Sequence, residues 1–179
     1  MARKQLFYLS LVVTVLSSLA LTAMGAPLTN SQTPWGILSF ELCAYGSSCT
    51  AIVQSWNSSV QLKAALSLGV DYLFMVAYSA TLFLGLLMMA DPVPPGLRRL
   101  TLGAAAAAWL AGAADALENY FLFQILLSPS NLQFAWPATA SATVKFILLG
   151  FTLGWLAFTY LGYGPHQLFG KGQVIPHSP

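Results

Sequence analysis

The chain alternates between long apolar stretches and short polar ones, and four of the apolar stretches are long enough to cross a bilayer. A helix of about 20 residues spans a hydrocarbon core of about 30 Å. The pattern predicts spanning helices at about residues 6–25, 64–90, 99–127 and 138–163. Residues 164–179 are rich in Gly and Pro, so we expect a loosely ordered tail. The predicted fold is an all-α membrane protein, a single four-transmembrane-helix bundle comprising residues 1–179.

The segment between the first two spans, residues 26–63, is too apolar for a plain linker. Within it, residues 35–45 and 48–56 have the pattern of two short amphipathic helices, which could cover the bundle as a lid. Aromatic rings prefer the membrane–water interface. We expect that position for the four aromatic residues of this segment, Trp35, Phe40, Tyr45 and Trp56.

Basic residues indicate the orientation of the spans. They lie before the first span, between the second and third, and after the fourth: Arg3, Lys4, Arg98, Arg99 and Lys171. Short loops rich in Lys and Arg stay on the cytoplasmic side. The sequence therefore predicts a multi-pass protein of the bacterial plasma (inner) membrane, with both termini cytoplasmic and with residues 26–63 and 128–137 outside.

Two features of the N-terminal half leave alternatives open. Residues 1–25 have the charged start and small-residue end of a signal peptide, but their apolar region is longer than the usual 7–15 residues, which favours a retained helix. Cys43 and Cys49 both lie in the outer segment, where disulfides persist. They form either a structural disulfide or two free thiols.

The few charged residues inside the spans define the candidate site. Charged residues make up 7% of the chain, against about 25% in soluble proteins. An ionised carboxylate in hydrocarbon costs at least ~2.5 kcal/mol, so these side chains should face protein, water or a ligand. At ~1.5 Å per helical residue, Asp71, Asp115, Glu118 and Lys145 all stand roughly 24–28 Å from the cytoplasmic helix ends. We predict one polar cluster in the outer leaflet, beneath the segment that carries Glu41.

The predicted binding residues are the charged groups of this level and the polar side chains near them. They are Glu41, Asp71, Tyr72, Tyr78, Asp115, Glu118, Asn119 and Lys145. The leading hypothesis is a non-enzymatic protein that binds membrane lipids or a small amphipathic ligand in this cluster, or that acts as a subunit of a larger membrane assembly.

Three other functions fit the same residues. A membrane enzyme could use Asp115 or Glu118 as general acid and Asp71 as base on a hydrophobic substrate. A buried lysine–carboxylate network could have a purely structural role, fixing helix register. A proton-coupled carrier is the third, although four helices without an evident inverted repeat argue against it.

Several classes of chemistry lack their residues. The histidines, His166 and His177, both lie in the predicted tail, so the bundle offers no His-based metal site or haem ligand, and we expect no metal and no cofactor. Nucleotide-binding glycine motifs are absent. The chain also has no basic face with interleaved aromatic residues, so we expect no nucleic acid partner.

Small residues recur at helical spacing in the third and fourth spans. Gly103, Ala107 and Ala111 form one small-xxx-small series, and Gly150 and Gly154 form another. Such series allow close approach of a neighbouring helix. They could serve packing within the bundle, a homo-oligomer or a larger membrane complex.

Four short elements occur in order along the chain: FEL at 40–42, DYLF at 71–74, DALEN at 115–119 and KF at 145–146. This set resembles a group of uncharacterised bacterial four-helix membrane proteins that share FEL, D-[FY]-L-F, D-x-x-E-N and K-[FW] elements, over about residues 35–150. The resemblance implies a role for the residues in these elements without implying an activity.

Overall fold

Four long helices form the protein in the computed structural model, which describes residues 2–46 and 48–169. They are α1 (Arg3–Gly25), α5 (Ser58–Met89), α6 (Pro95–Leu127) and α7 (Ala135–Phe169). Within the described residues, these four helices are long and apolar enough to cross a membrane. The predicted all-α, four-helix fold of a multi-pass membrane protein is confirmed.

The starts of α5 and α6 lie earlier in the chain than predicted. Asn57 caps α5, because its side chain accepts a hydrogen bond from the Val60 backbone N–H at 3.0 Å and so satisfies a free donor of the first turn. Pro95 occupies the first position of α6, where the missing N–H of proline costs nothing. Both helices therefore include a polar first turn that the hydropathy pattern alone does not reveal.

The end of α7 also differs from the prediction. The helix continues through residues 164–169, so the expectation of a loosely ordered tail is wrong for this part. The remaining predicted tail, residues 170–179, lies outside the described residues.

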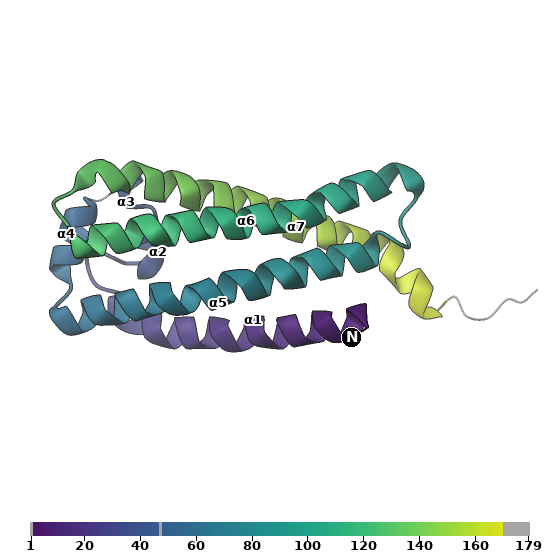
Figure 1. Cartoon of the computed structure of the whole chain (residues 1–179), viewed down its shortest axis with the longest axis horizontal. Helices are drawn as coiled ribbons and strands as arrows, with labels where there is room; N and C mark the ends of the chain where they lie inside the picture. Colours follow the sequence, from purple (N-terminus) through teal and green to yellow (C-terminus); the bar gives the residue numbers. More distant parts are fainter. Residues whose placement is uncertain (1, 47, 170–179) are drawn as a thin grey trace, which may run out of the picture.

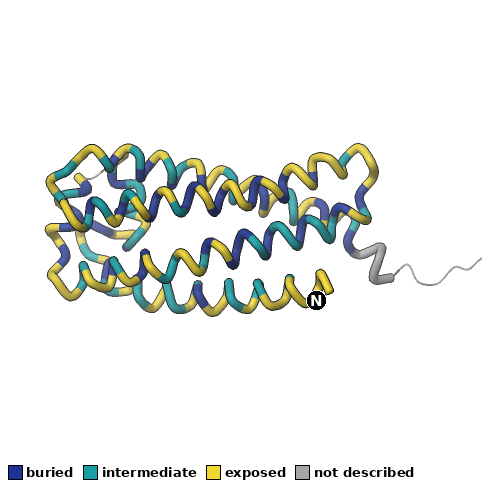
Figure 2. The backbone as a smooth tube through the Cα atoms, in the orientation of Figure 1, coloured by how far each residue is buried: buried dark blue, intermediate teal, exposed yellow. Residues whose placement is uncertain are grey.

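The long helices pack in the order α1, α5, α6, α7, with α7 also contacting α5 (Figure 1). The N-terminus and the turn between α5 and α6 lie at the same end of the bundle. Half of the residues in the apolar stretch of α6 are buried, compared with 6% of those in the apolar stretch of α1. The core is therefore formed mainly by α5 and α6, and α1 lies at its edge (Figure 2).

Polar contacts hold α1 against α5. Ser17 is buried, and the hydroxyl oxygens of Thr14 and Thr81 lie 3.1 Å apart. Inside a membrane, such contacts and close packing replace the hydrophobic effect as the source of helix association. The remainder of α1 is largely exposed on the outside of the bundle.

The closest approach of two spanning helices occurs at Gly112. A side chain here would clash with Ser79 Oγ and would lie 3.5 Å from the Met75 carbonyl oxygen of α5. Gly150 and Gly154 instead have open space where a side chain would lie, so no close approach occurs at this pair among the residues that the structure describes. Their role in an oligomer stays a prediction.

Short helices cover one end of the bundle. After η1 (Ala26–Leu28), the chain forms α2 (Ile37–Glu41), α3 (Cys43–Gly46) and α4 (Cys49–Ser55), and η2 (Leu132–Phe134) precedes α7. We call α2, α3 and α4 the cap. A disulfide joins Cys43 in α3 to Cys49 in α4, which decides between the two alternatives for these residues.

The cap shares a hydrophobic core with the ends of α5, α6 and α7, and this core buries two aromatic residues of the segment before α5. Phe40 and Trp56 are 0% and 3% exposed and pack edge to face with ring centroids 5.4 Å apart, so their predicted position at the membrane interface is wrong. The Trp56 ring N–H also donates to the Leu28 carbonyl at 3.1 Å. Trp35 and Tyr45 are exposed, as an interfacial position requires.

Candidate functional site

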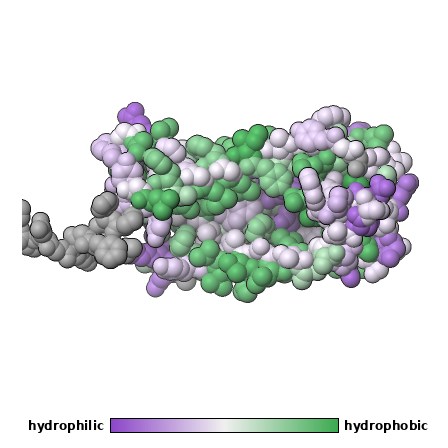
Figure 3. Space-filling view, turned by 180° about the vertical axis from the view of Figure 1, so that it is seen from behind, coloured by the Kyte–Doolittle hydropathy of each residue, from purple (hydrophilic) through white to green (hydrophobic). Residues whose placement is uncertain are grey.

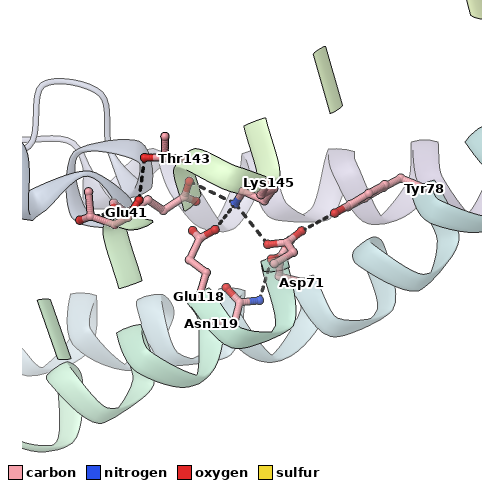
Figure 4. Close-up of polar contacts among 9 residues, drawn as sticks. Glu41, Asp71, Tyr78, Glu118, Asn119, Thr143 and Lys145 are labelled. Carbon is pink, nitrogen blue, oxygen red and sulfur yellow. Dashed lines mark hydrogen bonds and ion pairs between the residues drawn. The ribbon is translucent and has the colours of Figure 1, made fainter. Parts of the chain in front are cut away.

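The ammonium of Lys145 lies at the centre of a buried cluster of acidic side chains (Figure 4). Its Nζ is 2.6 Å from Glu118 Oε2, 3.2 Å from Asp115 Oδ1 and 3.4 Å from Glu41 Oε2. The Lys145 side chain is only 7% exposed. The structure therefore brings together residues of α7, α6 and α2. Lys145, Asp115 and Glu118 lie at a common level, as helix lengths predict.

Helix geometry explains how α6 contributes two of these groups. Asp115 and Glu118 are three residues apart, so they project from the same side of the helix. The Tyr78 hydroxyl of α5 donates to Asp115 Oδ2 at 2.9 Å. Asp115 thus connects α5 to Lys145 on α7, and the predicted polar faces of these three helices meet at one point.

A threonine of α7 positions Glu41, and the sequence analysis missed it. The hydroxyl of Thr139 donates to the Glu41 carbonyl oxygen at 3.0 Å and accepts from the Ala44 backbone N–H at 3.2 Å. These bonds fasten the end of α2 to α7. Thr139 lies six residues before Lys145, within two helical turns of it. This position is the one signal in the sequence that could have indicated its role.

Asp71 belongs to the same region but has a different partner. Its Oδ2 accepts a hydrogen bond from the Asn119 side-chain amide at 2.7 Å. Over residues 2–46 and 48–169, Asp71 forms no ion pair. Its carboxylate is therefore held in place by a neutral group.

The polar groups of the cluster are incompletely satisfied. Glu118 is fully buried, and its Oε1 has no hydrogen-bond partner in the described part of the chain. Buried polar atoms are nearly always paired, and an unpaired one costs about 1–3 kcal/mol, with more for a charged group. A network built for stability alone would be expected to satisfy this oxygen.

A cavity of ≈ 720 Å³ opens beside the cluster. Its polar lining includes Glu41, Asp71, Asp115 and Lys145, and its apolar lining includes Leu21, Ile37, Phe74, Phe146 and Leu149. In the view from behind, polar residues lie in a hollow between two apolar bands (Figure 3). The cavity therefore joins a charged floor to hydrophobic walls.

The walls of the cavity come from helices that do not pack extensively on one another. α1 packs on α5, and α7 packs on α6 and α5, but α1 and α7 make few contacts with each other although both line the cavity. Leu21, which lines the cavity, lies one turn after the buried Ser17 on α1, and helical spacing indicates that it faces inward but not that it borders a cavity. The cavity therefore lies between two spanning helices, α1 and α7.

Tyr72 is the one predicted site residue that the structure places elsewhere. It is 45% exposed, and its hydroxyl donates to the Ala116 carbonyl oxygen at 3.3 Å. It borders a separate hollow of ≈ 200 Å³ between α5 and α6. The reason is helical geometry, because a residue adjacent to Asp71 points about 100° away from it.

The described residues contain no group of three or more His, Cys, Asp and Glu side chains that could hold a metal ion. In the cluster, the ammonium of Lys145 already occupies the point between three carboxylates where a cation would bind. The geometry is therefore that of an internal lysine salt bridge beside an open cavity.

Comparison of the chain with protein-family models, with curated proteins and with solved structures finds no match. The resemblance to four-helix proteins with FEL and D-x-x-E-N elements stays a prediction.

Proposed function

We propose that this membrane protein binds a lipid-like or small amphipathic molecule in the cavity beside Lys145. The observation that carries the proposal is a single space whose floor is charged and whose walls are apolar. An amphipathic molecule has the same two chemistries joined in one structure. Its polar group would contact the carboxylates, and its chain would lie along α1 and α7 toward the lipid.

The size and the lining of the cavity support ligand binding over a purely structural role. Ligand sites in proteins typically occupy about 300–1,000 Å³, are mostly apolar and contain a few polar groups that orient the ligand. The cavity of ≈ 720 Å³ lies within this range. A structural network would gain nothing from an open space beside it.

We place the cap and the cavity on the outer side of a bacterial plasma membrane. The disulfide between Cys43 and Cys49 favours this side, because such bonds persist outside the cytoplasm. The basic pair Arg98 and Arg99 lies near the opposite end of the bundle, which is the end that the positive-inside rule assigns to the cytoplasm.

Cysteine labelling tests this orientation. The native cysteines are bonded, so the described residues contain no free thiol to react with a maleimide. We expect a membrane-impermeant maleimide to label Ser128→Cys, between α6 and α7, in intact cells. Gly96→Cys, in the first turn of α6, should react only after lysis. Labelling of Gly96→Cys but not of Ser128→Cys in intact cells would contradict the proposed orientation.

Filling the cavity tests the proposed function. Leu21→Trp adds a bulky side chain to the cavity wall, and we expect the amphiphile that co-purifies with the protein in neutral detergent to fall about tenfold, the factor produced by about 1.4 kcal/mol of lost binding free energy. Mass spectrometry of extracted lipids, normalised to protein, measures this amount. The matched control is Leu19→Trp on the same helix, where the leucine is 63% exposed and does not line the cavity.

The two variants give opposite outcomes if the proposal is right. Leu19→Trp should keep the wild-type amount of bound amphiphile, and both variants should unfold at the wild-type temperature within a few degrees. If the wild-type protein retains no molecule beyond the bulk membrane lipids, and Leu21→Trp changes nothing, the cavity has no ligand of this class.

A further inference from the structure

Resting on the proposed function, we propose that the polar group of the ligand is a cation, an amine or ammonium, and that Asp71 is its counter-ion. The inference names the charge of the ligand, which the lining of a cavity does not by itself determine. It depends on which groups of the cluster are already paired and which are free to receive a ligand.

The balance of charge around the cavity favours a cationic ligand. Four carboxyl groups, Glu41, Asp71, Asp115 and Glu118, belong to the cluster, and within the described residues Lys145 is the one base among them. The other basic residues of α5 and α6, Lys63, Arg98 and Arg99, are exposed near the helix ends. One ammonium can neutralise one carboxylate, so the site has room for further positive charge.

The arrangement around Lys145 disfavours an anionic ligand. An ammonium has three N–H donors. Its Nζ lies within 3.4 Å of three different carboxylates, so each donor has an acceptor in the protein. A phosphate or carboxylate group entering the cavity would have to displace one of these partners and approach the remaining acidic side chains. Such placement of like charges is unfavourable in a poorly solvated site.

Asp71 has the properties of a free counter-ion. It lines the cavity and is partly exposed there, and its one side-chain hydrogen bond comes from the neutral amide of Asn119 at 2.7 Å. This bond orients the carboxylate, and among residues 2–46 and 48–169 no donor to Oδ1 is found. Figure 4 shows Asp71 with the Asn119 amide directed at it. An amine in the cavity would supply the missing positive charge.

Aromatic side chains around the cavity complement the same ligand. Trp35, Phe74, Tyr78 and Phe146 all line it. A cation within about 6 Å of an aromatic ring is attracted to the face of the ring. The Lys145 ammonium already lies 4.7 Å from the Phe146 ring, so the site uses this interaction for one cation. Phe74, one turn along α5 from Asp71, is placed to assist a second.

Three probes with one tail and different head groups test the charge of the ligand. Dodecylamine, dodecanol and dodecanoate are titrated at neutral pH against the purified full chain in dodecyl maltoside, and native mass spectrometry measures binding. We expect dodecylamine to bind at least about tenfold more tightly than dodecanol, which corresponds to about 1.4 kcal/mol, and dodecanoate to bind most weakly. This comparison uses the wild-type protein and so does not depend on the folding of any variant.

Variants then test the counter-ion. Asp71→Asn should abolish the preference for dodecylamine over dodecanol, and Asp71→Glu should retain it. The matched control is Asp91→Asn, which removes an exposed carboxylate at the far end of the bundle and should keep the preference. A preference that survives in Asp71→Asn would overturn the assignment of Asp71.

The outcomes separate the two proposals. If dodecanol or dodecanoate binds the wild-type protein as tightly as dodecylamine, the cationic ligand is wrong, and the amphiphile-binding function stands. If none of the three probes binds and no molecule co-purifies, the proposed function itself fails, and the inference fails with it.

Discussion

Replacing Lys145 by methionine is expected to destabilise the protein by about 3–5 kcal/mol, the cost of leaving buried charges without their partner. Lys145 is 6% exposed and is the shared counter-ion of Glu41, Asp115 and Glu118. Without its ammonium, three acidic side chains face one another in a site that water hardly reaches. Methionine fills a similar volume, so the loss of stability comes from the missing charge and not from an empty space.

Thermal unfolding in neutral detergent, monitored by circular dichroism, measures this loss of stability. The amount of protein that accumulates in the membrane is a second measurement of it. The control is Lys63→Met, which removes an exposed lysine near the start of α5 and should change the unfolding temperature by no more than a few degrees. Equal stability of Lys145→Met and Lys63→Met would mean that the acidic groups do not need a buried counter-ion.

The helices and the central contacts could be predicted from the sequence because both follow from periodicity. Asp71, Asp115 and Lys145 each lie on a stripe of small or polar residues at helical spacing, and such stripes face inward in a membrane helix. Rise per residue then places the three side chains at one height. These two rules suffice to predict that Asp115 and Lys145 meet, and the contacts of Lys145 confirm it. Asp71 is in the same region, but its partner is Asn119 and not Lys145.

The cap and the cavity could not be predicted in the same way, because they depend on tertiary packing. Phe40 and Trp56 have the composition of interfacial residues, and they are buried because the short helices fold back onto the ends of α6 and α7. Tyr72 has the chemistry of a binding residue, but its position beside Asp71 turns it to another face of α5. No local pattern on α1 reveals that Leu21 borders an open space.

Neutralising the whole centre of the cluster should restore most of the stability that Lys145→Met loses. In the triple variant Lys145→Met/Asp115→Asn/Glu118→Gln, the ammonium and its two most buried partners disappear together. Replacing a buried ion pair or triad by well-packed hydrophobic residues of similar volume is often neutral or stabilising, whereas removing one member is costly. The amides of the triple variant keep the volume of the carboxyl groups without their charge. We expect the triple variant to unfold within about 1 kcal/mol of the wild type.

The same unfolding measurement, extended to the intermediate variants, forms a thermodynamic cycle. A triple variant as unstable as Lys145→Met would show that the lysine is needed for its packing, and would contradict the electrostatic account. Recovery would mean that the protein could be stable without these charges. Such a result would support the proposed ligand, and not the fold, as the reason for their presence beside an open cavity.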